Sequence, residues 1–422
     1  MRRIQTKQLK EWKQRPNRKP LILRGARQVG KTWLMKEFAR EEYDDYVYLN
    51  FEDDEPLKSL FVQDFDINRI VQTIELYTSK RVSAGVVLLL DEIQEASRGV
   101  TSLKYFYEKR PDIHVIAAGS LLGIASKQNG SFPVGKVDFV DVGPLSFLEF
   151  LVASGQESLA MAIETHRWDL LGAMSAKLRE LLLQYYYVGG MPEVVKNFVE
   201  NHDYNEVRRI QNAILDTYDN DFSKHAPIAE VPRIRMVWNS IRGQLAKENK
   251  KFLYGTLKKG ARAREFEIAI EWLRDAGLIY KVNRTKKGLM PLSAYEDFSA
   301  FKLYLLDLGL LTAMSKLSHQ VLLDGNDLFL DAKGAFAEQY VLQQLKAHGT
   351  GIDIYYWSAE NSMGEIDFLI QCGGKVVPIE VKAEENLRAK SLRMFVGSYA
   401  GMHGVRFSMS PYREQEWMTN FP

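Results

Sequence analysis

The chain has 422 residues, of which 46% are hydrophobic and 26% charged, and its formal net charge at pH 7 is +2. These values are typical of a soluble globular protein, and the length predicts two to four domains instead of a single core. The longest aliphatic run, VVLLL at 86–90, is far shorter than the roughly 20 residues that span a bilayer, and the one cysteine, Cys372, excludes an internal disulfide.

Residues 1–19 are basic and contain no apolar segment typical of a secretory signal, so together with the single cysteine they indicate a cytoplasmic protein without a membrane partner. From residue 20 to residue 142, short apolar strands alternate with amphipathic helical stretches. This order predicts βαβ units and a mostly parallel sheet. We expect an α/β domain at 1–145, with strands at PLILRG, YVYLNFE, GVVLLLDE, HVIAAGS and VDFVDVG.

The remaining sequence predicts three further parts. Helical patterns dominate 146–240, where FLEFLVAS, LRELLLQYYYV and EVRRIQNAILDTY are the main stretches and GGMPE separates two helices. In 241–330, the string AREFEIAIEWLRDAGLIYKV predicts a helix followed by a strand, and NRTKKG predicts a turn, an order typical of a winged helix. A last α/β part, 331–422, begins with the helix GAFAEQYVLQQLKAHG.

The string GARQVGKT lies between the first strand and a helix. It matches the phosphate-binding pattern G-x-x-x-x-G-K-[ST] and comprises Gly25, Ala26, Arg27, Gln28, Val29, Gly30, Lys31 and Thr32. The glycines allow backbone N–H groups to surround the phosphates, and the helix directs its positive end at them. We expect Lys31 to reach the β- and γ-phosphates of ATP and Thr32 to hold Mg²⁺.

Two later strands end in polar residues that suit the same site. VVLLLDEIQE ends in Asp91, which would support the Mg²⁺ shell, and Glu92, which would polarise the attacking water. HVIAAGS ends in Ser120, which is suited to sensing the γ-phosphate. The alternatives are an acidic strand end at a surface loop and an ordinary turn serine. No motif identifies the basic residue that completes ATP hydrolysis, for which the candidates are Arg27, Arg98, Arg110 and, as a sensor, Lys136.

Several strings also resemble a known family. LILRGARQVGKTWL, LLLDEIQ, AAGSLLG, GPLSFLEFL, YYYVGGMPEVV and FKLYLLDLGLL are similar to those of a widespread prokaryotic family of AAA-type P-loop ATPases, whose members carry a C-terminal domain of unknown function. The resemblance covers most of the chain. It implies an ASCE-type ATPase core with a parallel sheet, helical and winged-helix-like middle segments, and a nuclease-like fold at the C-terminus.

Basic residues are concentrated at 247–287, where there are twelve Lys and Arg but five Asp and Glu. Phosphate backbones bind such surfaces through counterion release, without any reading of base sequence. A winged helix would place one helix in the major groove and its wing against the backbone. We therefore expect double-stranded DNA as a partner of this segment. The alternative is a solvated face of a helical adapter or a protein-binding surface.

The string GEIDFLIQCGGKVVPIEVKA, at 364–383, predicts two strands joined at a pair of glycines. Nucleases of the PD-(D/E)XK type place an Asp on one strand, Glu-x-Lys on the next, and often a Glu on a preceding helix. The carboxylates hold Mg²⁺, which activates water and stabilises charge on the phosphodiester, while the lysine orients that water. The matching residues are Asp367, Glu380, Lys382 and Glu338, with Glu365 on the same strand face as Asp367. No proline precedes the aspartate, and surface ion pairs on an ordinary hairpin are the alternative.

Together these patterns predict an AAA-type ATPase in which ATP and Mg²⁺ control a metal-dependent, nuclease-like domain acting on DNA. A homo-oligomer is compatible with this prediction. Two alternatives stay open. One is an ATP-driven signalling or assembly switch that uses the nuclease-like fold as a binding platform. The other is an ATPase that remodels protein–DNA complexes without cleaving DNA.

Overall fold

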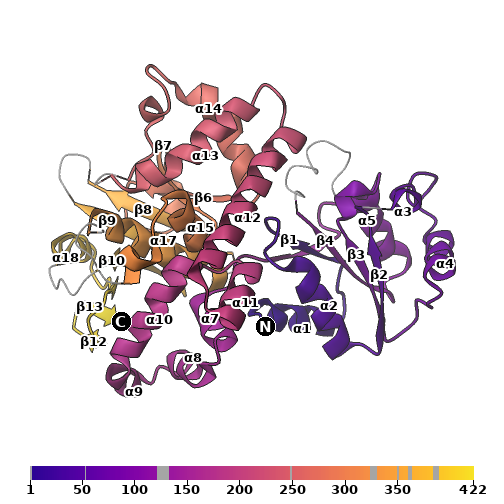
Figure 1. Ribbon diagram of the computed structural model, residues 1–422, viewed down its shortest axis with the longest axis horizontal. Coiled ribbons are helices and arrows are strands. Elements are labelled where there is room, and N and C mark those ends of the chain that lie inside the picture. The colour runs from indigo at the N-terminus through magenta and orange to yellow at the C-terminus, as the bar shows by residue number, and fades with distance from the viewer. Residues whose placement is uncertain are drawn as a thin grey trace. The chain divides into compact units, whose positions relative to one another are not determined.

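The computed structural model describes most of the chain, namely residues 2–52, 54–120, 133–247, 250–323, 330–348, 351–359, 364–383 and 389–422, with the side chains of 322–323 and 330–332 excepted. The chain divides into two compact units (Figure 1). The N-terminal unit comprises Arg2–Pro144 and Asp275–Leu278, and the C-terminal unit comprises Leu145–Arg274 and Ile279–Pro422. The four-residue segment at 275–278 therefore belongs with residues that precede it by more than a hundred positions.

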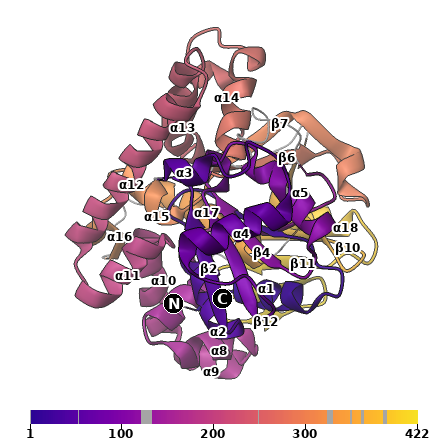
Figure 2. The same cartoon turned by 90° about the vertical axis from the view of Figure 1, so that its right-hand side faces the viewer.

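The N-terminal unit is built on a five-stranded sheet in the order β2-β3-β4-β1-β5, coloured indigo to purple in Figure 2. Every pair of neighbouring strands is parallel, which confirms the predicted parallel sheet. The carboxyl ends of parallel strands meet at one edge, so the residues after β1, β3 and β4 are brought together there. The strands are β1 (Leu21–Arg24), β2 (Asp45–Asn50), β3 (Val86–Asp91), β4 (His114–Gly119) and β5 (Asp138–Asp141).

Strand β3 is apolar along nearly its whole length because both faces of the sheet are covered. Helix α4 contributes its apolar side to this core and is capped by Asp66, whose carboxylate accepts hydrogen bonds from the N–H groups of Asn68 and Arg69. The helical elements of the unit are α1 (Gln5–Gln14), α2 (Lys31–Glu42), α3 (Glu55–Lys58), α4 (Ile67–Thr78), η1 (Ile93–Glu95) and α5 (Gly99–Lys109).

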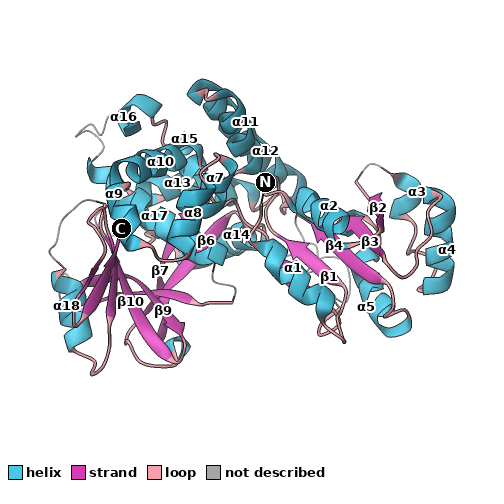
Figure 3. Ribbon diagram, turned by 90° about the horizontal axis from the view of Figure 1, so that it is seen from below, coloured by secondary structure: helices cyan, strands magenta, loops and turns pink. Residues whose placement is uncertain are grey.

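The C-terminal unit begins with the helices that the sequence predicts between 146 and 240, shown in cyan in Figure 3. They are α7 (Phe147–Ala153), α8 (Glu157–Glu164), α9 (Trp168–Ala173), α10 (Ser175–Val188), α11 (Pro192–Asn201), α12 (Tyr204–His225) and α13 (Val231–Leu245). The GGMPE string separates α10 from α11, as expected. Later helices are α14 (Ala263–Asp275), α15 (Leu308–Met314), α16 (His319–Leu323), α17 (Leu330–His348) and α18 (Lys390–Gly397), with the short turns η2 (Tyr254–Thr256) and η3 (Leu292–Tyr295).

The strands of this unit form one eight-stranded sheet in the order β12-β13-β11-β10-β9-β8-β6-β7. The antiparallel hairpin of β6 and β7 joins the sheet through a parallel pairing of β6 with β8, so strands from 241–330 and from 331–422 share it. The β9–β10 hairpin turns at Gly373 and Gly374, both with positive φ, as expected for this string. The strands are β6 (Ile279–Thr285), β7 (Glu296–Leu305), β8 (Ile354–Ser358), β9 (Glu365–Cys372), β10 (Lys375–Val381), β11 (Gly404–Phe407), β12 (Arg413–Glu414) and β13 (Met418–Phe421).

Asp307, the N-cap of α15, ties the helices of the C-terminal unit together. Its buried carboxylate accepts hydrogen bonds from the backbone N–H of Gly190 at 2.7 Å, from that of Leu310 at 2.9 Å and from the Gln343 side chain at 3.2 Å. A Cβ at Gly189 would lie 2.3 Å from this carboxylate. The strings YYYVGGMPEVV and FKLYLLDLGLL, more than a hundred residues apart, are therefore in contact.

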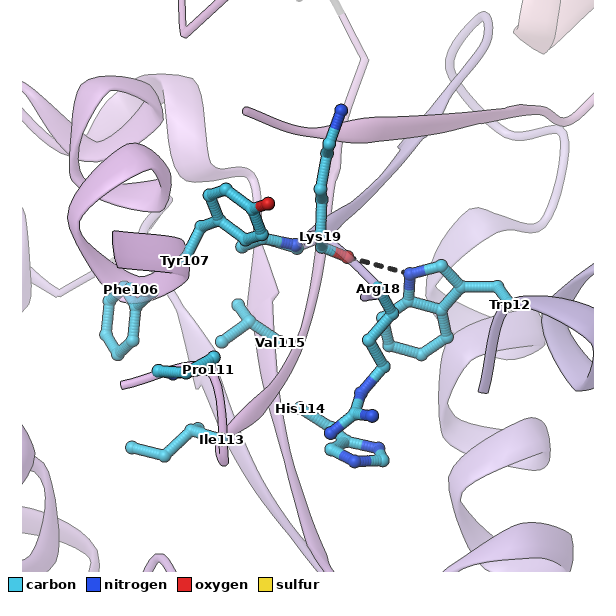
Figure 4. Close-up of a pocket in the computed structure, with 10 residues that line it drawn as sticks. Trp12, Arg18, Lys19, Phe106, Tyr107, Pro111, Ile113, His114 and Val115 are labelled. Atoms are coloured by element: carbon cyan, nitrogen blue, oxygen red, sulfur yellow. Dashed lines mark hydrogen bonds between the residues drawn. The ribbon is translucent and has the colours of Figure 1, made fainter. Parts of the chain in front are cut away.

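A small pocket lies at the amino ends of β1 and β4, the sheet edge opposite to the one that gathers the polar strand ends (Figure 4). Trp12, which donates a hydrogen bond to the Lys19 carbonyl at 2.7 Å, packs edge-on against His114. The other side of the imidazole is hydrogen-bonded to the Tyr43 hydroxyl at 2.7 Å. Burial, followed by the positive charges of Arg18 and Lys13, lowers the pKa of His114 from 6.5 to about 4.

Replacing this histidine tests the pKa shift. Between pH 6.5 and about 4 the unfolded chain binds a proton at His114 that the folded chain does not, so stability falls as the pH falls through this range. The contribution is at most about 3 kcal/mol, and less because the ring is partly exposed. We expect His114→Gln to flatten the pH dependence of urea unfolding between pH 7 and pH 4.5. An unchanged slope would contradict the shift, and His202→Asn, at an exposed histidine, is the control.

Candidate functional site

The loop Gly25–Thr32 connects β1 to α2, and its backbone requires glycine at two positions. Gly25 has φ 154°, and a Cβ there would lie 2.1 Å from the Val142 carbonyl oxygen. Gly30, the N-cap of α2, is left-handed with φ 91°. Gln28 also has a positive φ of 65°, which is costly for a residue with a side chain. This is the compact, strained turn that a phosphate-binding loop needs.

Lys31, the first residue of α2, is buried and folds back over the loop. Its ammonium donates hydrogen bonds to the carbonyl oxygens of Gly25 at 3.0 Å and Ala26 at 2.7 Å. Burial lowers the pKa of this lysine to about 8, against the opposing effects of Glu92 and Asp91. A cation held over a loop at a helix N-terminus is suited to bind phosphate oxygens.

Asp91, at the end of β3, is the second predicted component, and the structure brings it to the loop. One of its carboxylate oxygens accepts hydrogen bonds from the Thr32 hydroxyl at 2.7 Å and the Tyr48 hydroxyl at 2.9 Å. Burial raises the pKa of Asp91. A carboxylate and a hydroxyl in contact are hard oxygen donors, and they fit Mg²⁺ that arrives with a nucleotide. No motif marks Tyr48, on the neighbouring β2, and it was not predicted.

Glu92 and Ser120, from β3 and β4, are in direct contact. The Ser120 hydroxyl and backbone N–H donate to one Glu92 oxygen at 2.9 Å and 3.3 Å, and the Gln94 side chain donates to the same oxygen. Arg27 donates to the Ser120 hydroxyl at 3.4 Å, which places one of the candidate arginines beside this pair. In this arrangement Ser120 orients Glu92, a contact that the sequence did not indicate.

The other candidate basic residues contact groups of their own neighbourhood. Arg98 donates to the Val62 carbonyl oxygen at 3.0 Å, Arg110 pairs with Asp112 at 2.7 Å, and Lys136 pairs with Glu108 at 3.0 Å. Arg27 is therefore the candidate that the structure places beside Ser120, the residue that contacts the Glu92 carboxylate.

The segment Asp275–Leu278 lies against the same loop. Gly277 has φ 74°, and a Cβ on it would lie 3.1 Å from the backbone nitrogen of Ala26. The segment connects α14 directly to β6. A movement of the loop backbone at Ala26 would therefore press on the turn at Gly277.

In the C-terminal unit, the buried Glu338 and the half-buried Asp367 lie in a cluster that contains two lysines. The Glu338 carboxylate contacts Lys250 through one oxygen, while its other oxygen accepts a hydrogen bond from Tyr304 at 2.9 Å and lies 3.6 Å from Lys302. Lys302, on β7, has no exposed side-chain surface and also contacts the carboxylate of Glu365. Neither lysine was predicted as part of this site.

The lysines of this cluster lie against its acidic side chains and so provide their counter-charges. Burial and the adjacent Glu338 raise the pKa of Asp367 well above its usual range, which favours its neutral form, the form that can donate a hydrogen bond to Glu338. Burial opposes ionisation of Glu338 too, but Lys250 and Lys302 outweigh it and lower the pKa of this carboxyl. Lys250 contacts Glu338, and Lys302 lies between Glu338 and Glu365, so the two lysines face these two acidic side chains.

The other two candidates, Glu380 and Lys382, form an ion pair of 3.0 Å at the end of β10. The second carboxylate oxygen of Glu380 is buried and has no hydrogen-bond partner among the described residues. Across the described ranges, no three His, Cys, Asp or Glu side chains are grouped so as to hold a metal ion. The Glu338 carboxylate is engaged by cations and by Tyr304, so as arranged the cluster does not fit Mg²⁺.

The basic segment 247–287 contains paired, partly buried residues and exposed ones, and two of the exposed residues, Lys258 and Arg274, also pair with Glu265 and Glu271. Lys250 contacts Glu338, Lys281 lies 3.8 Å from Glu271, and Arg284 lies 2.6 Å from Asp297, so these three neutralise carboxylates of the C-terminal unit. The exposed basic residues of the segment are Lys247, Lys258, Lys259, Arg262, Arg264, Arg274, Lys286 and Lys287.

Comparison with family models assigns three stretches of the chain. Residues 17–151 match an AAA domain and include the phosphate loop, Asp91, Glu92 and Ser120. The N-terminal unit contains an AAA domain. Residues 179–321 match a domain of unknown function (DUF8612), and residues 333–420 match a second one (DUF4143), so neither match assigns a chemistry to the carboxylate cluster.

Among solved structures, the chain is similar to the Walker-type ATPase PABY2304 of Pyrococcus abyssi at 14% identity, covering 74% of this chain and 94% of that one with a TM-score of 0.47. It is also similar to the ORC1 protein of Aeropyrum pernix in complex with DNA, at 12% identity, 75% and 93% coverage and a TM-score of 0.28. No curated protein matches the chain. No helix in the described ranges is long and apolar enough to cross a membrane.

Removing the buried lysine tests whether the C-terminal cluster is balanced from within. We expect Lys302→Met to destabilise the C-terminal unit by about 3–5 kcal/mol, because Glu338 and Glu365 lose a buried counter-charge. The control is Lys196→Met at the exposed pair with Glu200 in the same unit, which should cost about 1 kcal/mol or less. Urea unfolding followed by circular dichroism measures both. Equal, small losses in the two variants would contradict the charge balance.

Proposed function

We propose that the chain binds and hydrolyses ATP at the N-terminal unit and uses the nucleotide state as a switch. The observation that carries this proposal is the convergence of Lys31, the Thr32–Asp91 contact and the Ser120–Glu92 contact from three neighbouring strands of one parallel sheet. Each of these groups has a distinct task in phosphoryl transfer to water.

The residues divide the work by charge and position. The loop N–H groups and the Lys31 ammonium bind the phosphates, so Lys31 exchanges the carbonyl oxygens of Gly25 and Ala26 for phosphate oxygens. Thr32 and Asp91 would hold Mg²⁺, which neutralises charge on the β- and γ-phosphate oxygens when it is bound. Glu92 orients the attacking water and accepts its proton. Arg27, next to Ser120, is the basic residue best placed to approach the γ-phosphate.

The turn at 275–278 supports a switch because it rests on the phosphate loop. Exchange of the Lys31 contacts for phosphate contacts changes the loop at Ala26, the residue that Gly277 approaches. The chain continues from this turn into α14 on one side and β6 on the other. Nucleotide binding therefore has a covalent route to two elements of the helical and sheet region.

Substitution of Glu92 tests the hydrolytic step. We expect Glu92→Gln to bind ATP as the parent does but to lower kcat by about 10²–10⁴-fold, because the amide cannot accept the proton of the attacking water. Lys31→Ala should lose ATP binding itself. Phosphate release measures turnover, and titration calorimetry measures binding.

Glu95→Gln, at an exposed carboxylate three residues away, is the control and should leave both quantities unchanged. Full turnover in Glu92→Gln would refute the role of Glu92. Hydrogen exchange at 275–278 with and without ATP tests the switch separately, and equal protection in the two states would exclude this turn as the route.

DNA is the partner that the exposed basic residues favour, and metal-dependent cleavage of DNA is the second candidate function. Cleavage is favoured by the contact between Glu338 and Asp367 and by the buried oxygen of Glu380 that has no hydrogen-bond partner within the described part of the chain. Cleavage is opposed by the contacts of Lys250 and Lys302 with the Glu338 carboxylate, which a metal ion would need as a ligand. We therefore infer a nuclease-like domain that binds without cleaving.

A DNA assay separates binding from cleavage. We expect Lys258→Gln/Lys259→Gln to weaken duplex binding and to reduce the slope of log K against log salt by up to about 2, with Lys196→Gln as a control outside the segment. With Mg²⁺ or Mn²⁺, and with or without ATP, the parent should leave plasmid and linear DNA intact. Cuts that disappear in Asp367→Ala/Lys382→Ala would reverse this inference and make the carboxylate cluster catalytic.

A further inference from the structure

Arg3 reaches the phosphate loop from outside the stretch that matches the AAA domain. The match begins at residue 17, whereas Arg3 precedes α1 and is 3% exposed. Its guanidinium donates one hydrogen bond to the carbonyl oxygen of Val29 at 2.9 Å and another to that of Gly143 at 2.6 Å. These acceptors are 26 and 140 residues away along the chain, so the contacts exist only in the folded unit.

The positions of the two acceptors show which segments the Arg3 guanidinium connects. Val29 is the residue before Gly30, at the point where the loop enters α2, and Gly143 follows β5. At the other end of the loop, Gly25 packs directly on the Val142 carbonyl, and the Val142 N–H donates to the Arg24 carbonyl oxygen at 2.8 Å. The exit of β5 therefore anchors the start of the loop through Gly25 and the end of the loop through Arg3.

The orientation of the Val29 peptide matters for phosphate binding. Loop N–H groups bind phosphate oxygens, and a loop carbonyl that turned towards the phosphates would repel them. A guanidinium that binds the Val29 carbonyl fixes that peptide with its oxygen away from the donors, and a charge-assisted hydrogen bond in a buried site does so more firmly than a neutral one. Helix α1 supports the position by packing against α2 and β5.

We propose that Arg3 is a positioning residue for nucleotide binding, which holds the phosphate loop in its binding conformation by joining Val29 to the exit of β5. This inference rests on the proposed ATP site. It assigns to the segment before the AAA match a part in forming that site. The ligand it acts on is a nucleoside di- or triphosphate, because the loop N–H groups and the N-terminus of α2 would bind the β-phosphate that both share.

The test compares Arg3→Gln, Arg3→Lys and the control Arg2→Gln, which removes an exposed arginine one position earlier. Mg²⁺-ADP and Mg²⁺-ATP are titrated by calorimetry into the full chain at a temperature where each variant is folded by circular dichroism. We expect Arg3→Gln to weaken both nucleotides by about tenfold, through loss of preorganisation, and Arg3→Lys by less, because a lysine can still bind one carbonyl. Under steady-state turnover, KM for ATP should rise while kcat stays within twofold.

Each outcome decides a different point. Affinity within twofold of the parent in a folded Arg3→Gln, with only the melting temperature lowered, would make Arg3 a structural residue and overturn the proposal. If Arg3→Gln does not fold, Arg3→Lys carries the test, and parent-like affinity and KM in that variant overturn it. Failure of the parent itself to bind ADP or ATP would instead refute the proposed ATP site.

Discussion

Buried charges paired with groups from distant parts of the chain are the constraint on which this structure depends. An unpaired charge in a protein interior costs several kcal/mol, so each such group requires a specific partner. Asp307 accepts hydrogen bonds from backbone N–H groups and from the Gln343 side chain. Lys302 pairs with two acidic side chains, and Arg3 donates hydrogen bonds to two carbonyl oxygens. Because these partners lie in separate elements, each pairing also determines which helices, strands and loops are neighbours.

The residues of the proposed nucleotide site could be selected from the sequence because most of them follow local rules. The loop spacing from Gly25 to Thr32 determines which atoms face the phosphates, and Asp91 and Ser120 each end or follow an apolar strand. Parallel strands bring their carboxyl ends to one edge whatever the rest of the chain does. Tyr48 and Arg3 were missed for the opposite reason, since neither belongs to a motif and each reaches the site only through the tertiary arrangement.

For the cluster around Glu338, the sequence predicts the local structure but not the partners of the charged side chains. The β9–β10 hairpin and its turn at the paired glycines were predicted, because alternation and glycine placement are local signals. The partners of its charges were not. Lys302 and Tyr304 come from β7, which was expected in a separate winged-helix-like part but lies in the same sheet, and Lys250 comes from the segment expected to bind DNA. A carboxylate motif cannot reveal whether a metal or a lysine neutralises it.

The two sites therefore differ in what they can exchange. At the nucleotide loop, Lys31 is held by backbone carbonyls, which are neutral, so phosphate oxygens can replace them with a gain in Coulomb energy. In the cluster around Glu338, the side chains of Lys250 and Lys302 contact acidic side chains. A metal ion would have to displace these positively charged lysines before it could bind the same acidic side chains. Phosphate binding at the first site is thus favoured by the existing charges, whereas metal binding at the second is opposed by them. This asymmetry supports the proposal that ATP is the ligand that changes the state of the molecule.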